Sequence, residues 1–430
     1  MQPDLIIRNA KFPWRNRLTE GEIVISSGKI IKLCKSFQGR GEKIINASRK
    51  IVLPGLIDVH VHLRDLNQAY KEDYYTGTCA AAAGGVTTVL DMPNTNPRTN
   101  SAKIIKMKKH IASKKAVVNV GFFSLFPNKP DDIRELAREG VVAFKVYPED
   151  LRETSSSLHI FFEAAAANRK LVAAHPELPL QETYTSPHQF LQLHTSFVET
   201  IAALTYTEPA IKTNCQLHLC HITSEFTVEI VKKMKTCFPL LSCEVTPHHL
   251  LLTQDALEKE GSPLKVLPPL RSKRDIKALW KAINQGIIDV VASDHAPHQK
   301  AEKEIPFCEA ASGFPGLETT LPLMLTQLNK GRITLQRLVD AFSERPAQIF
   351  RITNKGKVDE GYDADLTIIE PKKIDKIKPE NFHSKAKLSP FEGWKTKGKP
   401  EITIVNGIVV MEQGEIVAPQ GTGRIIEINK

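Results

Sequence analysis

The sequence PGLIDVHVHLR at residues 54–64 combines an apolar run with two histidines at alternate positions. Because side chains alternate between the two faces of a β-strand, His60 and His62 are expected to point in the same direction. This strand, taken as residues 51–62, is the first of eight apolar runs, the others lying at residues 86–92, 117–123, 141–146, 171–175, 216–222, 242–246 and 289–293. Helical patterns lie between or after them, at residues 158–168, 225–236, 274–285 and 335–342. Eight such units over about 300 residues predict an α/β fold with a (β/α)8 barrel.

Both ends of the chain show a different pattern, in which short strands are separated by turns. Strand-like stretches at the start lie at residues 5–9, 21–26, 29–33 and 43–46. Those at the end lie at residues 365–369, 401–405, 408–413 and 423–428. We therefore expect residues 1–53 and 351–430 to pair into one small β-sandwich domain beside a barrel formed by residues 54–350.

The composition restricts the class of protein. The 430 residues are 41% hydrophobic and 25% charged, which is typical of a globular chain with a sizeable core. Seven cysteines without a CxxC pair argue against a disulfide framework and favour a reducing cytoplasm. The first residues lack a signal-peptide pattern, and no apolar run is long enough to suggest a membrane span.

The net charge of +10 raises the question of nucleic-acid binding. Lysines are concentrated at residues 101–115, where no acidic residue occurs, and at residues 371–400. Apolar residues at helical spacing within the first run indicate the solvated face of a helix. Neither run has interleaved aromatic residues, so we expect no nucleic-acid partner.

The carboxyl ends of barrel strands are where functional side chains collect. Each residue found there has an ordinary interpretation, such as a hydrogen-bonded core histidine or a solvated lysine. Together, however, five of the eight strand ends carry metal-binding side chains or a lysine, namely His60 and His62, Lys145, His175, His221 and Asp294. Such a set predicts a metal-dependent active site. His218 precedes His221 by three, so only one of the two is expected to face the barrel mouth.

Several longer stretches resemble the dihydroorotase family, in the cyclic amidase branch of the amidohydrolase superfamily. They are PGLIDVHVHLR (54–64), GGVTTVLDMPNTNP (84–97), FKVY (144–147), LHLCHITS (217–224), CEVTPHHLLLT (243–253), PPLR (268–271), VASDHAPH (291–298), GLETTLPL (316–323) and SPFEGW (389–394). The motif match selects His221 as the ligand and leaves His218, His248 and His249 as structural histidines.

The resemblance implies two zinc ions per subunit. His60, His62 and Asp294 would bind the first ion, and His175 and His221 the second. A carboxylated Lys145 and a hydroxide would bridge the two ions, because an ammonium group cannot ligate a cation until it is converted to a carbamate.

The activity implied is the reversible, zinc-dependent cyclisation of N-carbamoyl-L-aspartate to (S)-dihydroorotate in de novo pyrimidine (UMP) biosynthesis. Asp294 would take a proton from the attacking hydroxide and deliver it to the ring nitrogen. Arg64, Asn94 and His298 would contact the substrate carboxylate. Backbone groups of the loop containing Ala311 and Gly313 would contact the ring amide. As an alternative to binding the substrate carboxylate, Arg64 could pair with an acid such as Asp65 or Glu72.

Two positions depart from the family pattern. Residues 65–69 read DLNQA where glutamate, proline and glycine are common, and Leu267 stands where asparagine commonly contacts the substrate. Loss of that hydrogen bond would weaken binding by roughly 1 kcal/mol.

The alternatives to dihydroorotase activity are a related allantoinase or dihydropyrimidinase (hydantoinase), or a catalytically silent scaffold. The expected partner is a small-molecule substrate, without a membrane, while a homodimer and association with aspartate transcarbamoylase stay open.

Overall fold

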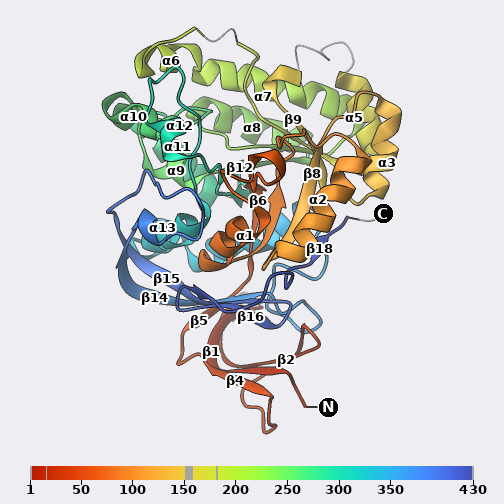
Figure 1. The fold of residues 1–430 in the computed structure, drawn as a ribbon, viewed down its shortest axis with the longest axis vertical. Coiled ribbons are helices and arrows are strands. Elements are labelled where there is room, and N and C mark those ends of the chain that lie inside the picture. The colour runs from red at the N-terminus through yellow and green to blue at the C-terminus, as the bar shows by residue number, and fades with distance from the viewer. Residues whose placement is uncertain (1, 16, 151–157, 181–182, 429–430) are drawn as a thin grey trace.

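The computed structural model describes residues 2–15, 17–150, 158–180 and 183–428. Its centre is a parallel sheet rolled into a nearly closed barrel (Figure 1). The strands follow one another in chain order, as β6 (Leu56–Val61), β7 (Val86–Asp91), β8 (Asn119–Leu125), β9 (Ala143–Val146), β10 (Leu171–Ala174), β11 (Leu217–Leu219), β12 (Leu241–Val245) and β13 (Val290–Val291). A bridge between Val61 and His295 brings the first strand beside the last. The predicted (β/α)8 barrel is confirmed.

Helices surround the barrel (Figure 1). The longer ones are α1 (Tyr74–Ala83), α2 (Ala102–Lys115), α5 (Leu158–Ala167), α7 (Ser196–Thr213), α8 (Glu225–Cys237), α11 (Lys273–Asn284) and α13 (Leu317–Asn329). Shorter ones are α3 (Ile133–Arg138), α6 (Pro187–Leu193), α9 (Pro247–Leu251), α10 (Gln254–Glu260), α12 (Lys300–Lys303), α14 (Leu335–Val339) and α15 (Arg345–Ile349). Among the described residues, no helix has the length and apolarity needed to cross a membrane.

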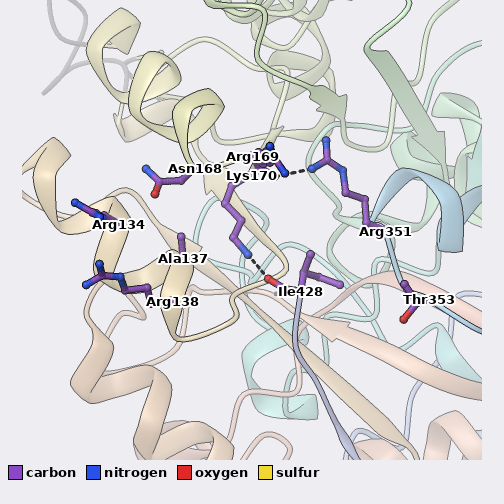
Figure 2. Close-up of a pocket in the computed structure, with 9 residues that line it drawn as sticks. All are labelled: Arg134, Ala137, Arg138, Asn168, Arg169, Lys170, Arg351, Thr353 and Ile428. Carbon is purple, nitrogen blue, oxygen red and sulfur yellow. Dashed lines mark hydrogen bonds between the residues drawn. The ribbon is translucent and has the colours of Figure 1, made fainter. Parts of the chain in front are cut away.

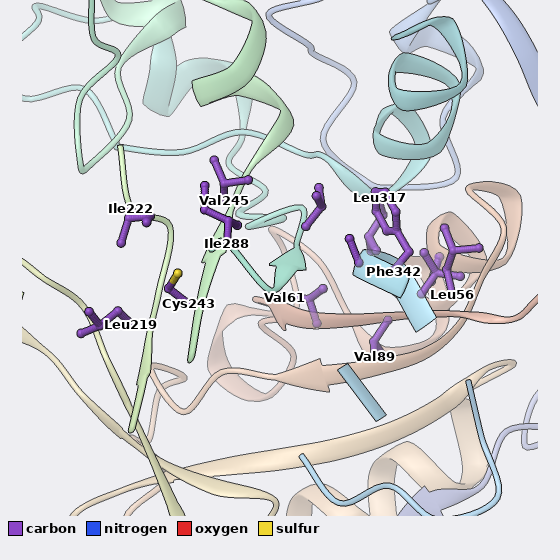
Figure 3. Close-up of a cluster of buried hydrophobic side chains, with 14 of the residues drawn as sticks. Leu56, Val61, Val89, Leu219, Ile222, Cys243, Val245, Ile288, Leu317 and Phe342 are labelled. Atoms are coloured by element: carbon purple, nitrogen blue, oxygen red, sulfur yellow. The ribbon is translucent and has the colours of Figure 1, made fainter. Parts of the chain in front are cut away.

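The alternation of side chains along each barrel strand separates the core from the site. On β9, Phe144 and Val146 join the large cluster between strands and helices, whereas Lys145 points to the barrel interior. Cys243 and Val245 of β12 belong to the same cluster (Figure 3). Burying this apolar layer fixes the register of each strand, because a shift by one residue would turn the interior polar side chains into the core.

A second sheet is built from both chain ends, as predicted. Its order is β17 (Glu415–Ile416), β16 (Ile408–Glu412), β15 (Lys395–Val405), β14 (Leu366–Lys376), β5 (Ile51–Pro54), β1 (Leu5–Trp14), β2 (Arg17–Ser26) and β3 (Lys29–Cys34), with β4 (Lys43–Asn46) on β1. Gly55 separates β5 from β6, so the single strand expected at residues 51–62 is two strands in different sheets. A Cβ on Gly55 would lie 2.1 Å from Thr87 Oγ1, which explains why glycine occupies the junction.

The last strand differs from the prediction. β18 (Ile425–Ile426) pairs in parallel with β8 of the barrel and leaves the sheet built by the two ends. Ile426 and Ile428 pack against apolar side chains of the barrel. Gly423 allows the close approach, because a Cβ there would lie 2.0 Å from Val118 O. The chain end therefore joins the barrel through apolar burial rather than through the sheet that its pattern suggested.

The lysines of α2 are not all solvated, and this part of the prediction is wrong. Lys108 is fully buried, and its Nζ lies 2.9 Å from Asp91 Oδ2 and 3.1 Å from Thr99 Oγ1. Asp91 also accepts a hydrogen bond from the backbone N–H of Leu63, between His62 and Arg64. This buried ion pair therefore ties α2 to the end of β6.

All seven cysteines are free, and none forms a disulfide.

Candidate metal centre and active site

Three of the predicted ligands meet at the ends of the first and last barrel strands. His60 lies on β6, His62 follows that strand, and Asp294 follows β13. Asp294 Oδ1 is 3.2 Å from His62 Nε2 and 3.4 Å from His60 Nε2. All three side chains are buried, and their ligand atoms lie within 4.8 Å of one another. Two imidazoles and one carboxylate at this spacing could hold a divalent cation.

His175 and His221 form the second half of the cluster. They follow β10 and β11, their ring centroids lie 4.5 Å apart, and His221 is 5.1 Å from the ring of His60. His175 Nε2 and His221 Nδ1 are buried without a hydrogen-bond partner among the described residues. Buried polar atoms are almost always satisfied, so two unpartnered ring nitrogens fit a site that takes a metal ion.

His218 and His221 both lie in the barrel interior rather than on opposite faces of one strand, but only His221 lines the cavity at the barrel mouth, while His218 contacts Ser242 and Glu244. β11 ends at Leu219, two residues before His221, so the alternation of side chains does not extend that far. His221 has a positive φ of 27°, which turns its side chain back towards the site. The two side chains are therefore not on opposite faces, because the strand ends before residue 221.

Lys145 lies on the interior face of β9 and is fully buried. Its Nζ is 2.7 Å from Cys220 Sγ, and within the described part of the chain it has no carboxylate partner. A buried ammonium group normally requires such a partner, because burial of an unpaired charge is strongly unfavourable. Its position beside the histidine cluster therefore fits a lysine that is converted to a carbamate.

Glu244, on the interior face of β12, contacts the histidine cluster, and this contact was not predicted from the sequence. Its two oxygens lie 2.5 Å from His60 Nδ1 and 3.0 Å from His218 Nε2, and His218 Nδ1 is 2.8 Å from Ser242 Oγ. The carboxylate thereby fixes the orientation of the His60 ring, as the outer partners of metal ligands commonly do. Its position two residues before the end of a predicted strand could have indicated this role.

The electrostatics of the cluster suit metal binding. Burial lowers the pKa of His175 and of His221 well below the ordinary value, and burial lowers that of His62 to about 4. These rings are therefore neutral and can ligate. Burial alone would raise the pKa of Asp294, but His60 and His62 outweigh burial and hold it well below its usual range. His60 differs from the other rings: burial would lower its pKa, yet the carboxylates of Glu244 and Asp294 raise it to about 10, so a cation that binds this ring must displace a proton.

A cavity of about 160 Å³ opens beside the cluster. Its lining includes the candidate metal ligands except Lys145, together with Arg64, Asn94, Tyr147, Pro148, Glu149, Val266, Leu267, Ala296, Ser312 and Gly313. Asn94 Oδ1 is 2.7 Å from His62 Nδ1, so this residue orients the ring of a candidate ligand. Leu267 also lines the cavity. Its side chain is apolar and offers no hydrogen bond where the family commonly has an asparagine.

Arg64 lies at one side of this cavity, and its guanidinium is suited to bind an anion there. Its NH2 group is 3.2 Å from His298 Nε2, and its Nε has no hydrogen-bond partner among the described residues. The alternative partners are engaged elsewhere, because Asp65 pairs with Lys115 at 3.0 Å and Glu72 accepts a hydrogen bond from Ser384. The buried guanidinium is thus available to a carboxylate that enters the cavity.

The loop after His298 contributes differently from the prediction. Gly313 lines the cavity together with Ser312, whereas Ala311 is not part of the lining. The backbone N–H of Ala311 donates to Glu302 O, and its carbonyl accepts from Lys303 Nζ at 2.8 Å. Both backbone groups of Ala311 are therefore used within the loop.

Comparisons with known proteins agree with this geometry. The profile of the Amidohydrolase family matches residues 51–410. The chain is 36% identical to a protein named dihydroorotase from Methanosarcina acetivorans, over 99% of this chain and 96% of the relative. It is 38% identical to one of the same name from Pyrococcus horikoshii, again over 99% and 96%.

Solved structures of similar fold carry other names. The L-hydantoinase (dihydropyrimidinase) of Arthrobacter aurescens matches with a TM-score of 0.92 and 29% identity, over 99% of this chain and all of that structure. Dihydropyrimidinase from Brevibacillus agri matches with a TM-score of 0.91 and 26% identity, over 98% of each chain. With its barrel, its histidine cluster and these matches, the chain belongs to the amidohydrolase family.

Proposed function

We propose that this chain is a dihydroorotase, which interconverts N-carbamoyl-L-aspartate and (S)-dihydroorotate. The observation that carries the proposal is the buried, unpaired guanidinium of Arg64 beside His298, in the same cavity as His60, His62 and Asp294. Dihydroorotate carries one carboxylate on its ring, and an arginine fork is the donor best suited to bind it. The names of the relatives support the same activity.

We propose that two zinc ions are the resident cofactor. His60, His62 and Asp294 would hold one, His175 and His221 the other, and a carboxylated Lys145 would lie between them. The unpartnered ring nitrogens and the unpaired buried lysine support this assignment. When bound, such a pair of ions lowers the pKa of a coordinated water and polarises a carbonyl group.

The side chains of the cavity would have separate roles in proton transfer and in substrate binding. The Asp294 carboxylate would accept a proton from the attacking water and return it to the ring nitrogen that leaves. Arg64 and His298 would hold the substrate carboxylate, and Asn94 would keep the His62 ring in place. The backbone at Gly313 would contact the ring amide, because glycine lets the chain approach closely.

Hydantoinase or dihydropyrimidinase activity is the second candidate, because solved structures of similar fold carry those names. Dihydrouracil lacks the ring carboxylate of dihydroorotate, so Arg64 would not strengthen its binding. The two candidates therefore differ in what they require of this one side chain.

A substrate panel tests the proposal. Zinc-loaded protein is assayed with dihydroorotate, dihydrouracil, hydantoin and allantoin, and the panel is repeated with Arg64→Met. A matched control is Arg274→Met, since Arg274 is exposed and pairs with Glu225. We expect turnover of dihydroorotate, with KM raised about tenfold or more in Arg64→Met because a charge-assisted hydrogen bond is lost. Turnover of the other substrates alone would overturn the proposal.

The remaining features are proposals of the same kind. We infer that residues 54–350 form the catalytic unit and that the protein acts in a reducing cytoplasm. Assembly into a homodimer and association with aspartate transcarbamoylase stay predictions, which size measurements alone and in mixtures would test.

A further inference from the structure

A second cavity, of about 450 Å³, lies at the opposite end of the barrel strands (Figure 2). Lys170 lines it and directly precedes β10, whereas His175 directly follows that strand. Four strand residues lie between the two, so they are five residue steps apart, a distance of about 17 Å at the usual rise of a strand. The lining consists of Arg134, Ala137, Arg138, Asn168, Arg169, Lys170, Arg351, Thr353 and Ile428. Five of these nine residues are basic and none is acidic.

Among the described residues, no carboxylate pairs with the arginines or the lysine that line this basic cavity. Arg134, Arg138 and Arg169 form no ion pair with any described residue. Arg351 NH1 donates to the backbone carbonyl of Arg169 at 2.9 Å (Figure 2), and Arg351 NH2 donates to Gln216 Oε1 at 3.3 Å, so both of its hydrogen bonds go to neutral acceptors. Like charges gathered without counterions repel one another. An arrangement of this kind is stabilised when an anion enters.

Lys170 forms the floor of the cavity. The side chain is buried, and Nζ donates to the carbonyls of Val141 at 2.8 Å and Ile428 at 2.6 Å. An ammonium group has three N–H donors, so one remains for a ligand. Burial, with Arg351 and Lys109 nearby, lowers the pKa of Lys170 to about 8.

Two of the arginines occupy backbone positions that normally favour glycine. Arg169 follows α5 with a φ of 55°, and Arg351 follows α15 with a φ of 53°. Residues just beyond a helix in this left-handed conformation are usually glycine, because a Cβ is disfavoured there. Arg169 is exposed, and its side chain makes no hydrogen bond or ion pair within the described residues, so its guanidinium is free to contact a ligand.

We propose that the basic cavity binds a small anion with adjacent phosphate groups, such as the phosphate chain of a nucleoside triphosphate or inorganic tripolyphosphate. Arginine forks match phosphate oxygens, and cations from α3, the end of α5 and the segment after α15 surround one space. The volume lies within the range of small-molecule pockets. No aromatic residue lines the cavity for base stacking, which disfavours a single-stranded nucleic acid.

Calorimetric titration of the full-length protein tests the proposal, with tripolyphosphate, ATP and AMP as ligands at low and high salt. We expect tripolyphosphate and ATP to bind about tenfold more tightly than AMP, and more weakly at high salt. Arg169→Gly should weaken both about fivefold or more without lowering the melting temperature, because glycine suits the left-handed backbone. Arg49→Gly is the matched control, since Arg49 is an exposed arginine with a φ of 64° in the second sheet region.

Each outcome is decisive. Equal binding of ATP and tripolyphosphate supports recognition of the phosphate chain itself, and tighter binding of ATP supports a nucleotide. Absence of binding at about 5 mM, a concentration that detects even weak sites, would overturn the proposal. So would binding that survives Arg169→Gly and Arg138→Gln together, or tighter binding of single-stranded RNA through the same arginines. None of these measurements uses turnover, so they stand apart from the proposed activity.

Discussion

Glu244→Gln is expected to weaken metal binding although Glu244 is not proposed as a ligand. The two Glu244 oxygens accept from His60 Nδ1 at 2.5 Å and from His218 Nε2 at 3.0 Å. A glutamine offers one oxygen and one NH2 group, so one imidazole must meet a donor instead of an acceptor. If that ring is His60, its proton moves to Nε2, the nitrogen that faces Asp294, and the ring can no longer ligate.

The expected size of this effect follows from the contacts. Substitutions of outer partners of metal ligands typically reduce metal affinity about 10- to 100-fold. That range corresponds to about 1.4–2.7 kcal/mol of binding free energy. Because Glu244 contacts the ligand ring directly and is fully buried, we expect a value at the upper end.

Metal affinity is measured by competition with a chromogenic zinc chelator, and zinc per chain by elemental analysis after dialysis. Ser242→Ala is the matched control, because it removes the far contact to His218 Nδ1 at 2.8 Å and a hydrogen bond to Leu217 O at 3.3 Å, but leaves both Glu244 contacts in place. Its affinity should stay within about threefold of the original, since a neutral hydrogen bond contributes little. Unchanged zinc affinity and turnover in Glu244→Gln would refute the role of this carboxylate.

Three further substitutions test the remaining parts of the account. Lys145→Ala should markedly reduce bound zinc and activity, and full zinc occupancy in that variant would refute the bridging role. Asp294→Ala should retain much of its metal while kcat falls about 10²- to 10⁴-fold, so near-normal rates would remove Asp294 as the acid/base. Lys108→Met leaves Asp91 buried and unpaired and should lower the free energy of unfolding by about 3–5 kcal/mol in urea denaturation. The double variant with Asp91→Asn should recover part of that loss, and equal stability of all three proteins would contradict the ion pair's importance.

The sequence was sufficient for the barrel because each strand repeats a short apolar run and each helix a longer period. It also indicated His60, His62, Lys145, His175 and Asp294, because they stand at or beside the carboxyl ends of those runs. Strand ends converge by topology alone, so side chains far apart in sequence could be grouped without coordinates.

What escaped prediction depended on contacts between distant segments. Lys108 can be buried because its ammonium group pairs with Asp91. β18 pairs with β8 because Ile426 covers apolar side chains of the barrel. The direction of His221 depends on where β11 ends, and strand boundaries are poorly fixed by periodicity. Ala311 was assigned to the site from a resemblance, but its backbone groups serve its own loop.

Reconstitution of metal-stripped protein tests the central claim most directly. The protein is freed of metal by exhaustive chelation and titrated with zinc while dihydroorotate turnover is followed. The convergence of four histidines, one aspartate and one lysine predicts no turnover in the stripped protein and a plateau at two zinc ions per chain. Undiminished turnover of the stripped protein, or zinc saturation without any turnover of dihydroorotate, would contradict it.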